Sequence, residues 1–135
     1  MNNNTFTKEE RLCSKRLIDS LFHSGSSFVL YPFRIVFCQA AHIAVPAQVI
    51  ISVSKRRYKK AVTRNLLKRR TREAYRTQKK EILYSFLEDH HLNLLIAIQY
   101  VGKTELSFAE MKVKLALALN KLKNESNHLY LGKDH

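Results

Sequence analysis

The amino-acid sequence predicts a single α+β domain, an α/β sandwich in which helices pack against one sheet. Patterned segments follow one another in the order helix, strands, basic helix, strand, helix, with no internal repeat and no interdomain linker. The length of 135 residues, 45% of them hydrophobic, suits one domain with its own core. Three glycines and two prolines are too few for a fibrous or disordered chain.

Capping signals predict two helices before the first strand. Thr7 and Glu10 have the spacing of a capping box, which predicts a helical turn near Lys8. Ser14 is placed to cap a longer helix, and Gly25 is expected to end it in the left-handed conformation. The apolar residues of that helix form one stripe at helical spacing: Leu17, Ile18, Leu21 and Phe22.

Strands are predicted where β-branched and aromatic residues gather. Residues 28–38 predict two strands separated by a break at Pro32, and residues 48–54 predict a third. Residues 91–101 contain an unbroken apolar run at residues 94–98, which is typical of a strand covered on both faces.

The last predicted element is a helix opened by a second capping box, from Ser107 to Glu110. Its apolar residues recur on one side: Phe108, Met111, Leu115, Ala118, Leu119 and Leu122. The domain is expected to span residues 8–123, which leaves residues 1–7 and 124–135 as flexible termini.

Positive charge is concentrated in one fifth of the chain. The net charge is +13, from 24 Lys and Arg against 11 acids. Residues 55–80 contain 13 of these cations and a single acid, Glu73, whereas the rest of the chain is nearly balanced. An excess this local favours binding to a polyanion, either a nucleic acid or an anionic membrane surface.

The basic segment predicts an amphipathic helix from about Ala61 onward. Its apolar face collects Val62, Leu66, Leu67 and Ala74. A separate arc of roughly 140° carries Arg64, Lys68, Arg69, Arg72, Arg76 and Lys79. Tyr75 falls inside this basic arc, and Arg70 falls among the apolar positions. Because the apolar face lacks the Trp or Phe with which a surface helix enters lipid, we predict a nucleic-acid partner and no membrane.

No spacing of residues typical of catalysis or metal binding is found. The three glycines are isolated, and the six histidines form no metal-binding pair and are expected at the surface or in loops. Cys13 and Cys38 are predicted to be small core residues rather than nucleophiles. We therefore predict no catalytic residue and no metal ligand in the protein. The polar N-terminus lacks a secretory signal, so a cytoplasmic location is expected.

The segment around the basic helix carries a longer pattern. Residues 52–55 read S-V-S-K, and residues 61–73 read A-V-T-R-N-L-L-K-R-R-T-R-E. They resemble the S/T-V-x-K strand end and the A-V-x-R-N-x-x-K-R-x-x-R-E helix of the bacterial ribonuclease P protein family. The resemblance covers residues 8–123. The sequence departs from the family's R-N-R triplet at Leu66, which replaces the second arginine and falls on the predicted apolar face.

The resemblance implies both a fold and a function. The fold is an α/β sandwich on a small mixed sheet, with a left-handed β-α-β crossover at the basic helix. The implied function is that of the ribonuclease P protein subunit, which binds a catalytic RNA and precursor tRNA and assists removal of the 5′ leader. In that enzyme the RNA and its Mg²⁺ ions perform the hydrolysis. No protein partner is predicted.

Two surfaces are assigned on matched positions and their neighbours. The RNA-binding residues are Lys55, Lys60, Arg64, Asn65, Lys68, Arg69, Arg72 and Arg76. The cleft for the single-stranded leader is assigned to Ile18, Phe22 and Val36, of which only Phe22 is aromatic. Two alternatives follow: leader contact depends less on stacking in this chain, or one of the neighbouring aromatics Tyr31, Phe33 and Phe37 compensates. A simple core position for Phe22 is the open alternative.

A second function fits the charge and the helical pattern equally well, namely a structural RNA-binding protein of ribosomal type. The register of the R-N-x-x-K-R-x-x-R-E pattern and the aromatic at Phe22 favour the ribonuclease P subunit. A protein-only nuclease is disfavoured because the sequence shows no clustered carboxylates.

Overall fold

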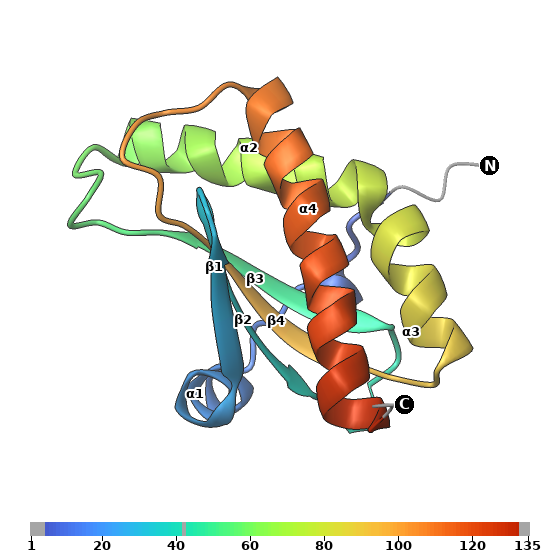
Figure 1. Ribbon diagram of the computed structural model, residues 1–135. Helices are drawn as coiled ribbons and strands as arrows, with labels where there is room; N and C mark the ends of the chain where they lie inside the picture. Colours follow the sequence, from blue (N-terminus) through green and yellow to red (C-terminus); the bar gives the residue numbers. More distant parts are fainter. Residues whose placement is uncertain (1–4, 42, 133–135) are drawn as a thin grey trace.

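Four strands form one sheet with helices on both sides in the computed structural model, which describes residues 5–41 and 43–132 (Figure 1). The strands are β1 (Ser26–Leu30), β2 (Phe33–Gln39), β3 (Ala47–Val53) and β4 (Leu94–Tyr100). The helices are α1 (Lys15–Ser24), α2 (Ala61–Lys79), α3 (Ser85–Asp89) and α4 (Phe108–Ser126). Shorter helical turns are η1 (Lys8–Glu10), η2 (Lys80–Tyr84) and η3 (Asn127–Leu131). The α+β class and the order of the predicted elements are confirmed.

The sheet is mixed and has the strand order β1-β2-β4-β3. β1 and β2 form an antiparallel hairpin, and β2 also pairs antiparallel with β4. β3 pairs parallel with β4, so that Ala47 lies opposite Leu94 and Val53 opposite Tyr100. The helical segment that starts with α2 therefore forms the crossover between two neighbouring parallel strands. The left hand of this crossover stays a prediction.

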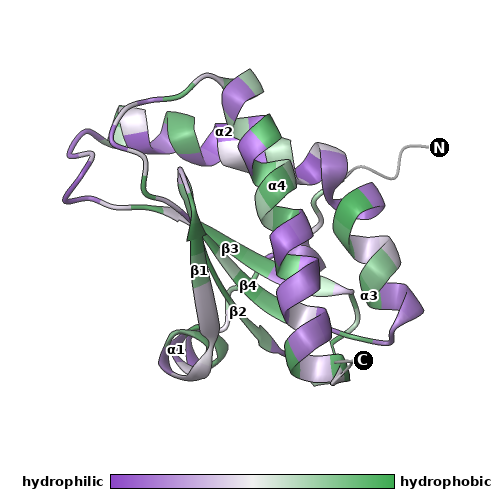
Figure 2. Cartoon of the chain, viewed as in Figure 1, coloured by the Kyte–Doolittle hydropathy of each residue, from purple (hydrophilic) through white to green (hydrophobic). Residues whose placement is uncertain are grey.

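The two faces of the sheet bury two separate hydrophobic clusters. The larger cluster lies between the sheet and helices α2 and α4, and it includes Phe33, Ile96 and Leu115. The smaller one lies under α1, where Leu21 packs with Val36 on the opposite face of the sheet. β4 is buried along almost its whole length, as its unbroken apolar run predicts. Figure 2 shows the contrast between the hydrophobic strands and the hydrophilic loop that leads into α2.

The helix starts follow their capping signals. The Glu10 carboxylate accepts a hydrogen bond from the Thr7 backbone N–H at 2.7 Å, and Ser14 Oγ accepts one from Leu17 N–H at 3.3 Å. At the start of α4, the Ser107 hydroxyl and the Glu110 carboxylate exchange the two hydrogen bonds of a capping box. Three of the predicted starts are thus set by local sequence.

Gly25 ends α1 for a different reason from the one predicted. Its φ of −74° and ψ of 157° are extended, so the left-handed conformation expected here is wrong. A Cβ at this position would lie 2.5 Å from the Leu21 carbonyl oxygen and 3.0 Å from that of Phe37. Glycine is required because α1 enters β1 in close contact with two backbone carbonyls.

Both chain ends take part in the packing of the domain. Residues 124–126 continue α4, and η3 extends the helix to Leu131. The ring of Tyr130 packs edge-on against Phe37 with centroids 6.3 Å apart, and Phe6 packs edge-on against Tyr75 at 5.8 Å. Residues 5–7 and 124–131, which were expected as flexible termini, thus contribute aromatic side chains that pack against the core, and their flexibility stays a prediction. Gly132 is exposed, and residues 1–4 and 133–135 lie outside the described residues.

The helical chain also continues beyond α2, which the sequence pattern did not predict. The π-helical turn η2 and the short helix α3 follow directly, and Leu83 and Leu87 are buried in the larger cluster. This extension brings the chain back to the sheet at the start of β4.

Candidate nucleic-acid interface

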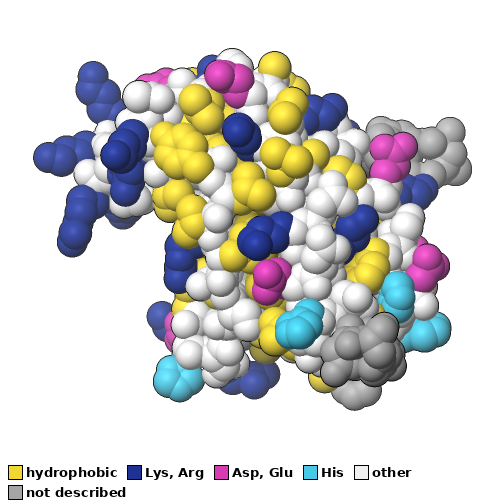
Figure 3. Space-filling view, in the orientation of Figure 1, with side chains coloured by type: hydrophobic (Ala, Val, Ile, Leu, Met, Phe, Trp, Pro, Cys, Tyr) yellow, Lys and Arg dark blue, Asp and Glu magenta, His cyan; other side chains and the backbone are white. Residues whose placement is uncertain are grey.

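Cations crowd the loop before α2. Lys55, Arg56, Lys59 and Lys60 are all exposed, and Figure 3 shows Lys and Arg side chains projecting at this end of the molecule. The loop is tied to the segment after β4, because the Tyr58 hydroxyl donates to the Gly102 carbonyl at 2.7 Å. The charged side chains therefore extend from a fixed backbone.

Arg64 supports this loop from inside α2. Its Nη1 donates to the backbone carbonyls of Tyr58 at 2.8 Å and Lys59 at 2.9 Å, and its side chain is half-buried. The predicted RNA-binding residue thus also positions the loop that carries Lys60. An arginine suits both tasks because its guanidinium has five donors in a fixed fork.

The exposed side of α2 carries Asn65, Arg69 and Arg72, with Lys68 half-buried beside them. They lie within two turns, so they present several donors at the spacing of a helix surface. These four residues form the basic face of α2. Multiple cations at such spacing are the arrangement that phosphates of a nucleic acid bind.

The buried side of α2 differs from the one predicted. Tyr75 is fully buried and Lys79 is only 2% exposed, although both were assigned to the basic arc. Val62, assigned to the apolar face, is 79% exposed. Leu67 and Ala74 of the predicted apolar face are fully buried, and Lys79 joins them because it has a buried partner, which hydrophobicity alone does not reveal.

That partner is Glu10, from the N-terminal turn. Lys79 Nζ and the Tyr84 hydroxyl both donate to Glu10 Oε2, and Lys79 Nζ also donates to the Thr5 carbonyl. The ammonium lies 5.5 Å from the Phe6 ring centroid and 5.1 Å from that of Tyr84, within cation–π range. The network fixes the N-terminal segment to the end of α2.

Burial and charge act in opposite directions on the pKa values of this network. Burial alone would raise the pKa of Glu10, but the hydrogen bonds from Lys79, Tyr84 and Thr7 together hold it below its ordinary value. Burial lowers the pKa of Lys79, and Glu10 only partly offsets this effect. Burial also raises the pKa of Tyr84. No sequence pattern indicates this pair, because its partners are 69 residues apart.

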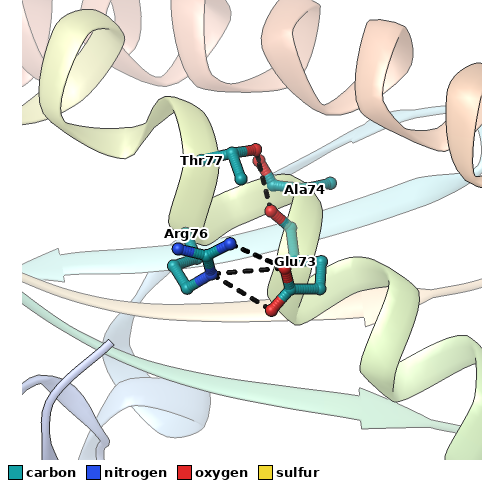
Figure 4. A network of polar contacts seen from close by, with 4 residues as sticks. All are labelled: Glu73, Ala74, Arg76 and Thr77. Carbon is teal, nitrogen blue, oxygen red and sulfur yellow. Dashed lines mark hydrogen bonds and ion pairs between the residues drawn. The ribbon is translucent and has the colours of Figure 1, made fainter. Parts of the chain in front are cut away.

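Arg76 reaches the surface as half of an ion pair. Its Nε and Nη2 donate to the Glu73 carboxylate at 2.8–3.3 Å, while the Thr77 hydroxyl donates to the Glu73 carbonyl at 2.9 Å (Figure 4). The hydrogen bond from Arg76 lowers the pKa of Glu73 below its ordinary value. A local acid therefore balances the charge of Arg76, whose contact with RNA stays a prediction.

The residues assigned to the leader share one side of the sheet. Phe22 lies on α1 and is 43% exposed, so its alternative assignment as a core residue is wrong. Ile18 is half-buried and Val36 is buried, both in the smaller cluster beneath α1. Phe22 is thus the member of this set with an available aromatic surface, and binding of a leader by all three residues stays a prediction.

A polar pair on the same side of the sheet was missed. Arg34 on β2 and Gln99 on β4 lie opposite each other, and Arg34 Nη1 donates to Gln99 Oε1 at 2.7 Å. They lie two residues along from Val36 and its neighbour Ala97, so they point to the side of the sheet that α1 partly covers. The signal in the sequence that could have identified this pair was Arg34, a charged residue inside a predicted strand.

Cysteines and histidines add no cluster to these surfaces. Cys13 is exposed, so its predicted core position is wrong, whereas Cys38 is half-buried and burial raises the pKa of its thiol. Four of the six histidines lie on the exposed surface: His23, His90, His91 and His128. The other two, His42 and His135, lie outside the described residues.

Within residues 5–41 and 43–132, no three His, Cys, Asp or Glu side chains are grouped to hold a metal ion. No helix in this part of the chain is both long and apolar enough to cross a membrane.

Comparison with known proteins agrees with this architecture. A protein-family model described as Ribonuclease P matches residues 6–123. The ribonuclease P protein component of Porphyromonas gingivalis is 38% identical over 97 residues, which cover 71% of this chain and 70% of the relative. That of Chlorobium phaeobacteroides is 32% identical over 108 residues and covers 73% of each chain.

Solved structures share the fold. The RNase P protein of Staphylococcus aureus superposes with a TM-score of 0.69 at 23% identity, covering 84% of this chain and 95% of that one. The RNase P protein from Thermotoga maritima superposes with a TM-score of 0.67 at 24% identity, covering 83% and 96%. These likenesses confirm the predicted fold class.

Proposed function

The chain belongs to the ribonuclease P protein family, and from this premise we propose that it binds the catalytic RNA of that enzyme and the 5′ leader of precursor tRNA. In this proposal the protein becomes part of an endonuclease only together with the RNA, in the cytoplasm. The RNA and its Mg²⁺ ions supply the phosphodiester hydrolysis. The protein contributes affinity and charge, and no protein or membrane partner is required.

The observation that carries the proposal is the basic face of α2. Asn65, Arg69 and Arg72 are exposed on it, and the loop that precedes it adds Lys55 and Lys60. Cations fixed on a helix neutralise phosphates without losing much side-chain freedom, and they release counterions on binding. The protein would thereby reduce repulsion between the catalytic RNA and its substrate, which lowers the Mg²⁺ concentration needed for cleavage.

The test is cleavage of a 5′-extended precursor tRNA at low Mg²⁺ concentration, with the protein alone, with a bacterial ribonuclease P RNA alone, and with both. Cleavage at the mature 5′ end is expected only in the complete mixture. Cleavage by the protein alone would contradict its non-catalytic role. Intact RNA binding without stimulation would instead favour the structural RNA-binding alternative.

Phe22 is proposed to stack on a base of the leader. Replacing it by alanine is expected to weaken binding of leader-containing precursor tRNA to the assembled enzyme by about 1 kcal/mol, roughly fivefold, the lower end of base–aromatic stacking. The matched control is mature tRNA, which has no leader and whose affinity should stay constant. Equal losses for both RNAs would show that Phe22 acts elsewhere.

A further inference from the structure

A pocket of about 380 Å³ opens where the first turn of α4 meets α2. It is lined by Leu66, Arg69, Arg70, Glu73 and Phe108. We propose that this pocket binds one unpaired base of the catalytic RNA, between the Phe108 ring and Leu66. This inference rests on the proposed function, because the same helix presents the basic face to that RNA. The volume of the pocket falls within the range of about 300–1,000 Å³ that is typical of small-molecule sites.

The pocket has an apolar wall that the core does not use. Phe108 is 38% exposed, although it begins the stripe whose next members, Met111 and Leu115, are fully buried. Leu66 is half-buried and faces the pocket rather than completing the core as predicted. Figure 3 shows hydrophobic side chains gathered over α4 and its crossing with α2, with Lys and Arg among them. An exposed aromatic ring beside cations is the pattern on which single-stranded bases stack.

The polar groups of the pocket are held in place. Arg70 Nη1 donates to the Leu106 carbonyl at 2.6 Å, which fixes its guanidinium beside the start of α4. Glu73 is kept ionised by Arg76, which lowers its pKa, and a carboxylate retains acceptor sites beyond those that one arginine fills. The pocket therefore combines a stacking surface, two cations and an acceptor for the amino group of a base.

The charge around the pocket favours RNA as its occupant. Arg69 belongs to both the pocket and the basic face, and Arg72 follows one turn later. A phosphate held by these arginines would place its own or a neighbouring base within reach of Phe108. RNA is recognised mainly through such unstacked bases in loops and bulges, which pack against aromatic rings or guanidinium planes. The cations would equally repel a basic protein segment.

Leu66 contributes part of the apolar wall of this pocket. The motif of the family it resembles has arginine at this position, whose cationic head would enter the space that Leu66 and Phe108 leave apolar. The leucine removes one cation from the helix and adds one wall of a base pocket.

The chain contains no tryptophan, so a single introduced indole reports on one place. Phe108→Trp puts it in the pocket, and Leu117→Trp puts it at an exposed position (49%) farther along the same helix. On titration with ribonuclease P RNA, the fluorescence of Phe108→Trp is expected to be strongly quenched by the stacked base. That of Leu117→Trp should change little. Precursor tRNA alone should quench neither.

Affinity gives a second measurement that does not depend on the introduced indole. Phe108→Leu is expected to weaken binding of the catalytic RNA roughly 5- to 150-fold, the range for loss of one base–aromatic stack. Leu117→Ala is the matched control and should leave affinity unchanged. Circular dichroism would verify that each variant folds.

The outcomes separate this proposal from the proposed function. If wild-type protein does not bind the catalytic RNA, the proposed function itself fails. If all variants bind but Phe108→Trp is not quenched and Phe108→Leu keeps full affinity, the pocket proposal is overturned while the function stands. Quenching by precursor tRNA alone would overturn the assignment to the catalytic RNA. The pocket proposal is supported if the catalytic RNA, but not precursor tRNA, quenches Phe108→Trp and if Phe108→Leu binds the catalytic RNA more weakly.

Discussion

Replacing Lys79 by alanine is expected to destabilise the protein by about 3–5 kcal/mol, the cost of leaving one partner of a buried ion pair unpaired. Lys79 is 2% exposed, and its ammonium donates to Glu10 and to the Thr5 carbonyl. The substitution would leave the Glu10 carboxylate with only Tyr84 and a backbone N–H to stabilise it. Urea unfolding followed by circular dichroism measures the change.

The matched control replaces both partners at once. In Glu10→Gln/Lys79→Met, the charges are gone and the shapes are nearly kept, so we expect a much smaller loss than in Lys79→Met alone or Glu10→Gln alone, each of which leaves one partner without its counterpart. The coupling between the two sites in this double-mutant cycle measures the pair directly. Equal losses in Lys79→Met and the double variant would contradict this role of the pair, because removal of the Glu10 charge would then bring no relief.

The Glu10–Lys79 pair also predicts how the stability of the protein depends on pH. The pKa of Glu10 is lowered by folding, so its stabilising contribution is complete above the unfolded-state pKa of about 4.3 and is lost as pH falls through the folded value. Wild-type protein should therefore lose stability below about pH 4 more steeply than the double variant. Lys79 has the opposite effect at alkaline pH. Because folding lowers its pKa, burial of the charged lysine costs free energy at neutral pH, and this cost is relieved as pH rises toward the unfolded-state pKa of about 10.4.

Features set by neighbouring residues were predictable from the sequence, whereas features set by distant partners were not. The capping boxes at Thr7 and Ser107 and the doubly buried strand β4 each depend on a few adjacent residues, and each was confirmed. The burial of Lys79 at the end of α2 depends on Glu10, and the close approach at Gly25 involves the carbonyl of the distant Phe37 as well as that of Leu21. Hydrophobic periodicity carries no information on such partners.

The candidate interface also has features that the sequence predicts and features that depend on contacts in the folded protein. The concentration of charge in residues 55–80 located the basic helix correctly. It did not distinguish the exposed Arg69 and Arg72 from Arg64, which holds the loop, or from Arg76, which is paired with Glu73. Their roles differ because of contacts with backbone carbonyls and an acid, and a count of cations treats all of them alike.

This distinction decides which arginines should carry the salt dependence of RNA binding. The double variant Arg69→Ala/Arg72→Ala is expected to weaken binding of the catalytic RNA by about 1–3 kcal/mol, roughly 5- to 150-fold. Each phosphate contact contributes about 0.7–0.9 to the slope of log affinity against log salt concentration, so the slope should flatten by about 1.4–1.8. Filter binding over a series of salt concentrations measures both quantities.

The control for net charge is Lys15→Ala/Arg16→Ala, which removes two equally exposed cations from α1. If RNA contacts the basic face of α2, this control should leave the slope nearly unchanged, because counterions are released only where phosphates are bound. Arg64→Ala is a poorer probe, since it also removes two hydrogen bonds to the loop before α2. Equal flattening in both double variants would mean that the RNA responds to the charge of the whole protein, and the assignment of the interface to α2 would then fail.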